Sequence, residues 1–373
     1  MPRNGSGTDI PTAGQPVSSG TVIDSTIFNA MVTDVYAEIT NSIARDGQSP
    51  ATANIPMGGF RVTGVADPVG AQDAATKAYA DLLASQGVSA AKNRIINGDM
   101  RIDQRNSGAA QVFLAQAALA YSVDRWYAYC TSIGVPGDAI TGQQIFSTDD
   151  YLYRFTGAAN ITGVGFGQRI EYLNSYDLAS TTVTLSATMT ITPLTSVAWA
   201  AYYANTTNAF GTVATPTRTL ISSGAFTVGA TDTDVSVSFA VPAGAITGIE
   251  ILFTIGALTS GTWTVRNVQL ESGTAKTAFD KRDVAAELVR CQRHYETGNF
   301  SEILPISNGD VIGSFYTSTG FITTKFAVPT ITGTSDQGTF NALNIRADNV
   351  SLGRSDVVAN RFNTGTYVAE IEL

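Results

Sequence analysis

The chain has 373 residues, of which 44% are hydrophobic and only 14% are charged, and its formal net charge is −9. Such an acidic chain repels phosphate backbones, which argues against nucleic-acid binding. No run of about 18 apolar residues is present to span a membrane, and the first residues lack the apolar segment of a secretory signal. We therefore expect no membrane insertion and synthesis in a cytoplasm.

The length predicts two or three domains, and composition shifts along the chain suggest where they begin. The segment from Met1 to Gly20 is rich in Gly, Ser, Pro and Thr, so we expect it to stay extended unless a partner holds it. The predicted parts are residues 1–53 with one helix, residues 54–92 as a junction with a short helix, residues 93–296 as a β-sandwich with a closing helix, and residues 297–373 as a small β unit.

A helix is predicted over residues 24–46, because Asp24 or Ser25 can cap its start and Gly47 can end it. Its apolar residues recur at every fourth position, at Ile27, Met31, Val35, Ile39 and Ile43. No second helix of matching length lies nearby. We therefore favour packing against copies of itself around a three-fold axis, and packing within its own domain is the alternative.

A shorter helix is predicted over residues 74–85, with Asp73 as its cap and Gly87 as its end. Its inner face contains Tyr79 and Leu82 together with small residues, which allow helices to approach closely near a symmetry axis. These two residues and the apolar ladder of the first helix are the predicted trimer contacts. The chain is thus expected to form a homotrimer.

Residues 93–282 contain many short apolar runs that are separated by turn signals. Alternation of apolar and polar residues is clearest in residues 182–191 (TVTLSATMTI) and 234–241 (DVSVSFAV). This period over many short strands predicts an antiparallel sandwich with one buried face per sheet. A jelly roll of about eight strands fits the count, so the predicted fold class is mainly β.

A helix is expected to close the sandwich, with Asp283 as its cap. Its single apolar stripe consists of Val284, Leu288, Cys291 and Tyr295. The small β unit of residues 297–373 follows, and trimer contacts would help to stabilise a unit of this size. Its last residues, 367–373, alternate and predict a final strand.

The sequence contains no convincing catalytic set. His294 is the one histidine, which argues against a Ser-His-Asp triad and against a zinc site built on Cys291. Asp232 and Asp234 would share a strand face, so a two-carboxylate glycosidase is an alternative, although Asp is also common in turns. Residues 163–167 (GVGFG) lack the spacing of a dinucleotide loop and predict a turn. We expect no enzyme activity and no cofactor.

Aromatic residues in a weakly charged stretch are the candidates for carbohydrate contacts, because sugar rings stack on exposed aromatic faces. Trp199, Tyr202 and Tyr203 lie in such a stretch. Between residues 181 and 261 the charged residues are Arg218, Asp232, Asp234 and Glu250. The alternative is that these aromatic side chains belong to the core.

Residues 54–81 (NIPMGGFRVTGVADPVGAQDAATKAYAD) carry the most specific pattern in the chain. They resemble the junction in many bacteriophage tail fibre proteins, where a virion-anchoring part ends and the distal part begins. The matching residues are Asn54, Met57-Gly58-Gly59-Phe60, Asp67-Pro68 and the run from Ala71 to Tyr79. The resemblance implies that residues 1–20 dock on adaptor or nozzle proteins of a phage tail, so the protein is expected in the virion after synthesis in the host cytoplasm.

A second resemblance concerns the frame of residues 93–296, which is similar to a phage-fibre sandwich module related to carbohydrate-binding jelly rolls. The matching points are Asn97-Gly98-Asp99, Asp124-Arg125-Trp126, Gln269-Leu270-Glu271 and Cys291-Gln292-Arg293-His294-Tyr295. Modules of this kind can bind calcium near the first and last strands, which implies Asn97, Asp99 and Glu271 as candidate ligands. A turn at residues 97–99 is the alternative.

The two resemblances together imply a trimeric phage tail fibre that attaches to the virion by its N-terminus. Its distal β-rich part would bind a host surface receptor, expected to be a glycan, and several weak sites would act together through avidity. A structural adaptor that carries another receptor-binding protein is the first alternative. A polysaccharide hydrolase is the second.

Overall fold

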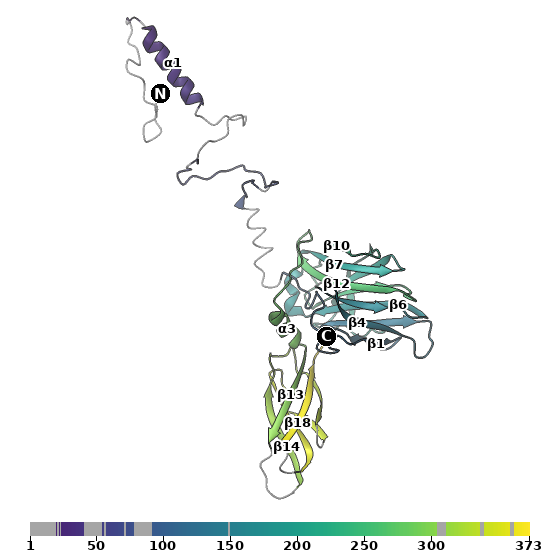
Figure 1. The fold of residues 1–373 in the computed structure, drawn as a ribbon. Coiled ribbons are helices and arrows are strands. Elements are labelled where there is room, and N and C mark those ends of the chain that lie inside the picture. The colour runs from purple at the N-terminus through teal and green to yellow at the C-terminus, as the bar shows by residue number, and fades with distance from the viewer. Residues whose placement is uncertain are drawn as a thin grey trace. The chain divides into compact units, whose positions relative to one another are not determined.

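The computed structural model describes residues 20, 22, 24–40, 54–55, 57–70, 72–77, 92–147, 150–303, 311–335, 339–358 and 362–373. The chain divides into two units, Met1–Tyr79 and Ala80–Leu373 (Figure 1). Within the described ranges, no helix is long and apolar enough to cross a membrane. The four-part division made from the sequence stays a prediction.

Helix α1, Ser25–Thr40, forms in the predicted segment of the first unit. It begins where expected, because the carboxylate of Asp24 accepts a hydrogen bond from the backbone N–H of Thr26 at 2.7 Å. This bond satisfies one of the N–H groups that have no partner within the first turn of a helix.

The predicted trimer contacts are described only in part. Ile27 is 37% exposed and its neighbour Phe28 is 47% exposed, whereas Met31 and Val35 are half-buried. The other predicted contacts lie outside the described residues, namely the side chain of Ile39 and the residues Ile43, Tyr79 and Leu82. The homotrimer therefore stays a prediction.

The expected role of Asp73 as a helix cap is not what its hydrogen bonds show. Its carboxylate accepts from the backbone N–H groups of Val69 at 2.9 Å and Gly70 at 2.7 Å, which precede it in the chain. The Asp73 side chain thus closes the turn after Pro68, because the chain bends back at Gly70 and presents these two N–H groups to it.

The first part of the second unit is a sandwich of two six-stranded sheets. The first sheet has the order β1-β4-β5-β12-β7-β10, with β1 Gln111–Leu114, β4 Ala139–Ser147, β5 Asp150–Thr156, β12 Thr262–Ser272, β7 Thr182–Thr192 and β10 Thr233–Ala240. The second has the order β2-β3-β6-β11-β8-β9, with β2 Ala120–Tyr121, β3 Trp126–Ser132, β6 Ile161–Ile170, β11 Ile249–Ile255, β8 Ser196–Ala204 and β9 Arg218–Thr227.

Every pair of these strands is antiparallel, and the chain passes repeatedly from one sheet to the other, as in a jelly roll. The predicted mainly β, antiparallel jelly-roll class is confirmed. The strands outnumber the expected eight, and two of the additional ones, β1 and β2, are short edge strands.

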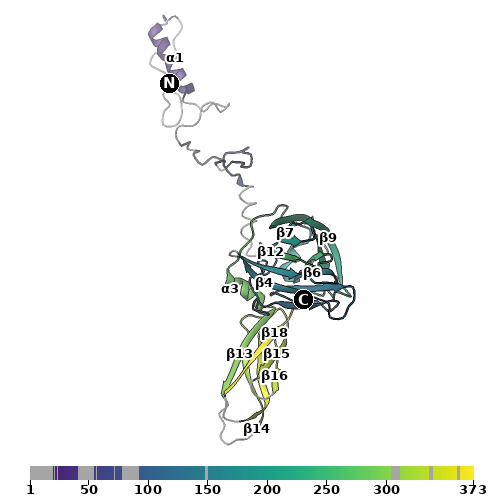
Figure 2. The same cartoon turned by 45° about the vertical axis from the view of Figure 1, so that its right-hand side comes forward.

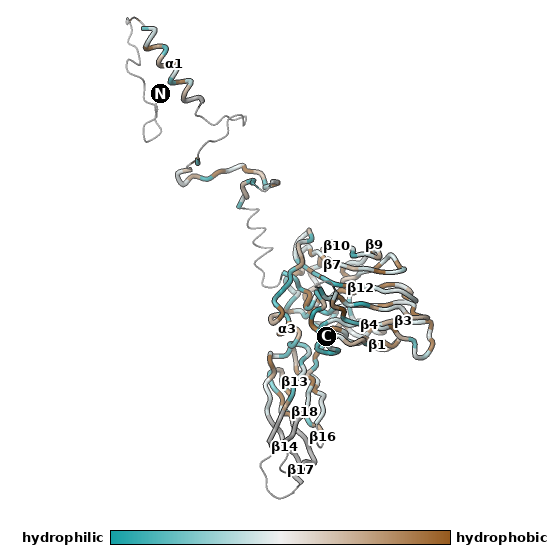
Figure 3. The backbone as a smooth tube through the Cα atoms, in the orientation of Figure 1, coloured by the Kyte–Doolittle hydropathy of each residue, from teal (hydrophilic) through white to brown (hydrophobic). Residues whose placement is uncertain are grey.

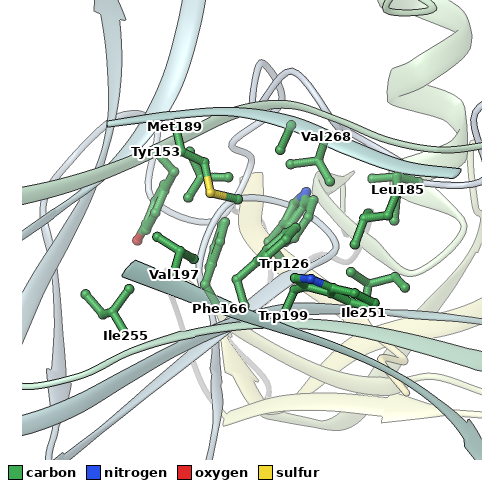
Figure 4. Close-up of a cluster of buried hydrophobic side chains, with 14 of the residues drawn as sticks. Trp126, Tyr153, Phe166, Leu185, Met189, Val197, Trp199, Ile251, Ile255 and Val268 are labelled. Carbon is green, nitrogen blue, oxygen red and sulfur yellow. The ribbon is translucent and has the colours of Figure 1, made fainter. Parts of the chain in front are cut away.

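The core lies between the two sheets, and apolar residues recur along the strands of both (Figure 3). An aromatic group forms its centre, where the Trp126 and Phe166 rings stack with centroids 4.7 Å apart and Tyr153 stacks on Phe166 at 5.2 Å (Figure 4). The Trp126 indole N–H donates to the backbone oxygen of Asn97 at 2.9 Å. Trp126 is thus a core residue with a satisfied polar group.

The closing helix α3, Val284–Gln292, has the predicted cap, because the Asp283 carboxylate accepts from the N–H groups of Ala285 and Ala286. The helix ends before Tyr295, since that residue already begins strand β13. Two three-stranded sheets then form the small C-terminal unit (Figure 2), with the orders β13-β18-β15 and β14-β17-β16. Their bounds are β13 Tyr295–Ile303, β14 Val311–Gly320, β15 Thr330–Ser335, β16 Thr339–Leu343, β17 Asn349–Val358 and β18 Phe362–Glu370.

Buried charges join this small unit to the sandwich. Glu372 forms ion pairs with Arg105, at 2.9 Å, and with Arg125. His294 is fully buried beside them, and its Nδ1 lies 4.0 Å from Glu372 Oε2. Neither ring nitrogen of His294 has a hydrogen-bond partner among the described residues.

Two groups at this junction have pKa values displaced in opposite directions. Burial, assisted by Arg125, lowers the pKa of His294 well below its usual 6.5, so the folded state keeps the ring neutral. Burial raises the pKa of Asp124 from 3.8 to about 7. On acidification below pH 6.5 the unfolded chain gains a proton at His294 that the fold does not, which costs stability. Between pH 3.8 and about 7 the fold holds a proton on Asp124 that the unfolded chain lacks, so acidification adds stability.

Single variants should separate the two effects. In His294→Phe only Asp124 of these two groups still titrates, so the free energy of unfolding of this variant should be higher at about pH 5 than at about pH 7.5. In Asp124→Asn only His294 of the two still titrates, so the free energy of unfolding should be lower at about pH 5 than at about pH 7.5. Each group changes the free energy of unfolding by at most about 1.4 kcal/mol per pH unit. Urea unfolding at both pH values measures this, and wild-type pH dependence in both variants would contradict it.

Candidate functional site

The outer face of the second sheet gathers tyrosines around small residues. The strand registers place Tyr129 of β3 opposite Gly165 of β6, and they place Tyr202 of β8 opposite Glu250 of β11. Mostly small residues lie between these tyrosines, namely Gly163, Gly165, Gly167, Thr254, Ala198 and Ala200, together with the larger Leu252 opposite Gly167 and Ala200. We call this face of the sheet the tyrosine face; its Tyr127 is buried, and its Tyr129 and Tyr202 are half-buried.

The glycines of β6 make room for the tyrosine rings. A Cβ atom on Gly165 would lie 2.2 Å from Tyr129 Cε1, and one on Gly167 would lie 2.5 Å from the Tyr127 hydroxyl oxygen. The turn predicted for residues 163–167 is therefore wrong. This segment lies inside β6, and its glycines are needed because the rings occupy the space above the strand.

Substitution of Gly165 tests this packing. Gly165→Ala should lower the free energy of unfolding by about 1–3 kcal/mol, because the added methyl group forces the Tyr129 ring away. Gly256→Ala is the matched control, since a Cβ atom there meets nothing within 4 Å, and it should change stability by less than about 0.5 kcal/mol. Urea denaturation compares the two, and equal stabilities would contradict the packing.

A cavity of about 400 Å³ opens at the Tyr129 end of the tyrosine face. Its walls come from the loop after β1, at Gln116–Ala118, and from the β8–β9 loop, at Thr212–Ala214, while Tyr129 and Thr131 supply the strand side. Burial raises the pKa of Tyr129, so its hydroxyl stays protonated and can donate a hydrogen bond at neutral pH. The cavity thus combines an aromatic ring, apolar walls and a few hydroxyl groups.

Arg169 of β6 holds the β8–β9 loop against the sheet. Its Nη2 donates to the backbone oxygen of Gly211 at 2.9 Å, directly before the residues that line the cavity. Its Nη1 donates to the main-chain oxygen of Leu373 at 2.7 Å. The same guanidinium lies 5.4 Å from the ring centre of the buried Phe210. One cation therefore connects the sheet, the cavity wall and the last residues of the small unit.

Glu250 balances this cation at the Tyr202 end of the tyrosine face. Its fully buried carboxylate lies 2.8 Å from Arg169 Nε, forms a second ion pair with Arg218, and accepts from the Tyr127 hydroxyl at 2.7 Å. Arg218 in turn lies over the ring of Tyr202, 4.2 Å from its centre. Two of the four charged residues in the weakly charged stretch, Arg218 and Glu250, thus belong to a buried network.

The three predicted carbohydrate contacts fall in different environments. Trp199 is 5% exposed and stacks on Phe226 and Phe239, with centroids 6.0 and 5.4 Å apart, so it belongs to the core (Figure 4). It presents no ring face to a ligand because β8 points it between the sheets. Tyr203 is half-buried and packs against the core. Tyr202 is the one of the three that lies on the tyrosine face, and Tyr129 is a candidate that the sequence did not suggest.

The candidate calcium ligands have protein partners. The Asn97 side chain binds the backbone of Ile102 in both directions, at 2.8 and 2.9 Å, and so holds a turn. Asp99 pairs with Arg101 at 3.1 Å. The Glu271 carboxylate accepts from the N–H and the hydroxyl of Thr277.

Among the residues that the structure describes, no group of three or more His, Cys, Asp or Glu side chains is placed to hold a metal ion. Asn97, Asp99 and Glu271 each have protein partners, and the calcium site stays a prediction. Their roles are those of a turn, an ion pair and a loop anchor, which agrees with the alternative stated for residues 97–99.

No protein-family model matches the chain, and no curated protein matches it either. Among solved structures, a CBM4 carbohydrate-binding module is 16% identical over 48% of this chain and 98% of its own, with a TM-score of 0.30. The enzymatically active domain of tailspike protein 4 from bacteriophage CBA120 is 16% identical, over 50% of this chain and 22% of its own, with a TM-score of 0.29. The N-terminal cellulose-binding domain of a Cellulomonas fimi β-1,4-glucanase is 14% identical, over 48% and 95%, with a TM-score of 0.26. Because these TM-scores are low, the jelly-roll assignment rests on the strand order of the sandwich and not on these similarities.

Proposed function

We propose that this protein is a bacteriophage tail fibre protein that binds a host surface glycan through the tyrosine face. The observation that carries the glycan part is the cavity beside Tyr129, because it offers an aromatic ring and hydroxyl groups between two loop walls. A sugar ring stacks its C–H groups on such a ring and exchanges hydrogen bonds with the polar groups around it. The phage part is supported by the resemblance of residues 54–81 to tail fibre junctions.

Attachment and assembly are assigned to the first unit. In this proposal residues 1–20 dock on adaptor or nozzle proteins of the tail, and α1 packs with two other copies through the side that exposes Ile27 and Phe28. Three weak glycan sites on one trimer then act together, and several fibres on one particle increase the effect. A monomeric mass of the full chain in solution would contradict the assembly.

Two other functions are compatible with the sequence, those of an adaptor and of a polysaccharide hydrolase. An adaptor that carries another receptor-binding protein would need no glycan site, and the Tyr129 cavity favours the adhesin. A hydrolase would need a carboxylic acid with a raised pKa. The pKa of Asp234 is instead lowered, first by the hydrogen bond from the Thr188 hydroxyl and then by Lys276. We therefore propose adhesion without catalysis.

The proposed function is tested by binding of the full chain to host cells and to isolated host surface polysaccharide. Tyr129→Ala and Tyr202→Ala should each weaken binding by about tenfold or more, equivalent to about 1.4 kcal/mol. Tyr176→Ala is the matched control, because Tyr176 is an exposed tyrosine outside the tyrosine face. Unchanged binding by both tyrosine-face variants would reject this site, and capture of another phage protein without any glycan binding would favour the adaptor.

A further inference from the structure

A second hollow of about 460 Å³ lies on the outer face of the first sheet, across β7, β10 and β12. Its volume falls within the roughly 300–1,000 Å³ of small-molecule sites. It is separate from the tyrosine face, which belongs to the other sheet. Asp232 and Asp234, which the sequence offered as a carboxylate pair, both line it.

The floor of this hollow carries hydroxyl groups, because Ser186 and Thr188 of β7 both line it. The Thr188 hydroxyl donates to the Asp234 carboxylate at 2.6 Å. The floor therefore offers hydroxyl groups that can exchange hydrogen bonds with a polar ligand.

The walls carry two cations and two anions. Arg266 pairs with Asp232, and Lys276 lies 3.1 Å from Asp234. A bulge in β12 follows Arg266 and places Asn267 at a positive φ of 51° beside the hollow. Because the lining charges balance, neither an anion nor a cation gains a net attraction there, and a neutral polar ligand fits best. Phe279 supplies an apolar side chain at the edge.

We propose that this hollow is a second saccharide site, which takes a neutral, hydroxyl-rich sugar unit. The Asp234 and Asp232 carboxylates accept from sugar hydroxyl groups, Arg266 and Lys276 donate to sugar oxygens, and Ser186 bonds at the floor. The two aspartates thus bind hydroxyl groups instead of cleaving a glycosidic bond. Each subunit would then hold glycan on both outer faces of its sandwich, which adds to the avidity of the fibre.

The test uses the full chain with neutral methyl hexosides as probes, and saturation-transfer NMR as the readout. Asp234→Ala and Lys276→Ala should each weaken binding of at least one hexoside fivefold or more, and Tyr129→Ala should leave that hexoside bound. Ser236→Ala is the control, because Ser236 is exposed on β10 and does not line the hollow. Glucuronate should compete poorly, since the hollow has no net positive charge.

The outcomes separate this site from the tyrosine face. If Asp234→Ala and Lys276→Ala bind every hexoside as wild type does, or if no hexoside binds the wild-type chain, the second site is rejected. Tighter binding of glucuronate than of the hexosides would also overturn it. Loss of host-polysaccharide binding in Tyr129→Ala together with wild-type hexoside binding in Asp234→Ala would reject the second site and keep the proposed function. Weakened hexoside binding in Asp234→Ala together with wild-type polysaccharide binding in Tyr129→Ala and Tyr202→Ala would keep the second site and reject the tyrosine face.

Discussion

Replacement of Glu250 by alanine is expected to lower the free energy of unfolding by about 3–5 kcal/mol. The Glu250 carboxylate is fully buried and is shared by Arg169, Arg218 and the Tyr127 hydroxyl. Its removal leaves two largely buried guanidinium groups without their counter-charge. Breaking one side of a buried ion pair costs much more than the pair itself contributes, because the remaining charge has lost its hydration.

The matched control is an exposed ion pair in the same unit. Asp177 pairs with Arg94 and is 44% exposed, so Asp177→Ala should cost less than about 1 kcal/mol. Urea denaturation monitored by tryptophan fluorescence measures both variants. A Glu250→Ala protein that is as stable as Asp177→Ala would show that the network around Glu250 does not support the fold.

Replacement of Trp199 by alanine should also destabilise the protein by about 3–5 kcal/mol, because it leaves a large cavity between the sheets. Trp199 stacks on Phe226 and Phe239 in the core. The folded fraction should bind glycan as wild type does, since this ring does not reach the surface. Tyr202→Ala should show the opposite pattern, with weakened binding and a smaller loss of stability.

This pair of variants separates a packing role from a ligand role in neighbouring residues of one strand. Stability is measured by urea denaturation, and binding is measured below the unfolding transition on host polysaccharide. A stable Trp199→Ala protein that fails to bind would restore Trp199 as a ligand contact. It would also mean that the side chain of Trp199 lies on the outer face of the sheet and not between the two sheets.

Local patterning predicted the architecture well. The alternation in residues 182–191 is the inward and outward sequence of β7, with Leu185 and Met189 buried and Ser186 turned outward. The cap at Asp283 also follows from local chemistry, because a carboxylate at that position meets the free N–H groups of the first turn. These features depend on residues that are close together in the chain, so a single sequence was enough to predict them.

The candidate site is formed by strands that are far apart in the sequence. The sequence does not show which of these strands become neighbours in the sheet. In β8 the run SVAWAAYYA has apolar side chains on both faces, so its pattern could not tell whether Trp199 points inward. The glycines of β6 looked like a turn because the tyrosines that cover them lie on β3. A single carboxylate in the apolar run IEILFTI indicates a buried partner for Glu250, but it does not indicate that Arg169 and Arg218 provide it.

Glycan binding at the tyrosine face is tested most directly by a structure of the full chain bound to an oligosaccharide from the host surface polysaccharide. We expect a sugar ring against Tyr129, enclosed by residues 116–118 and 212–214, with Trp199 still buried in the core. A complex in which the oligosaccharide is bound only by the small C-terminal unit, and the tyrosine face is empty, would contradict it.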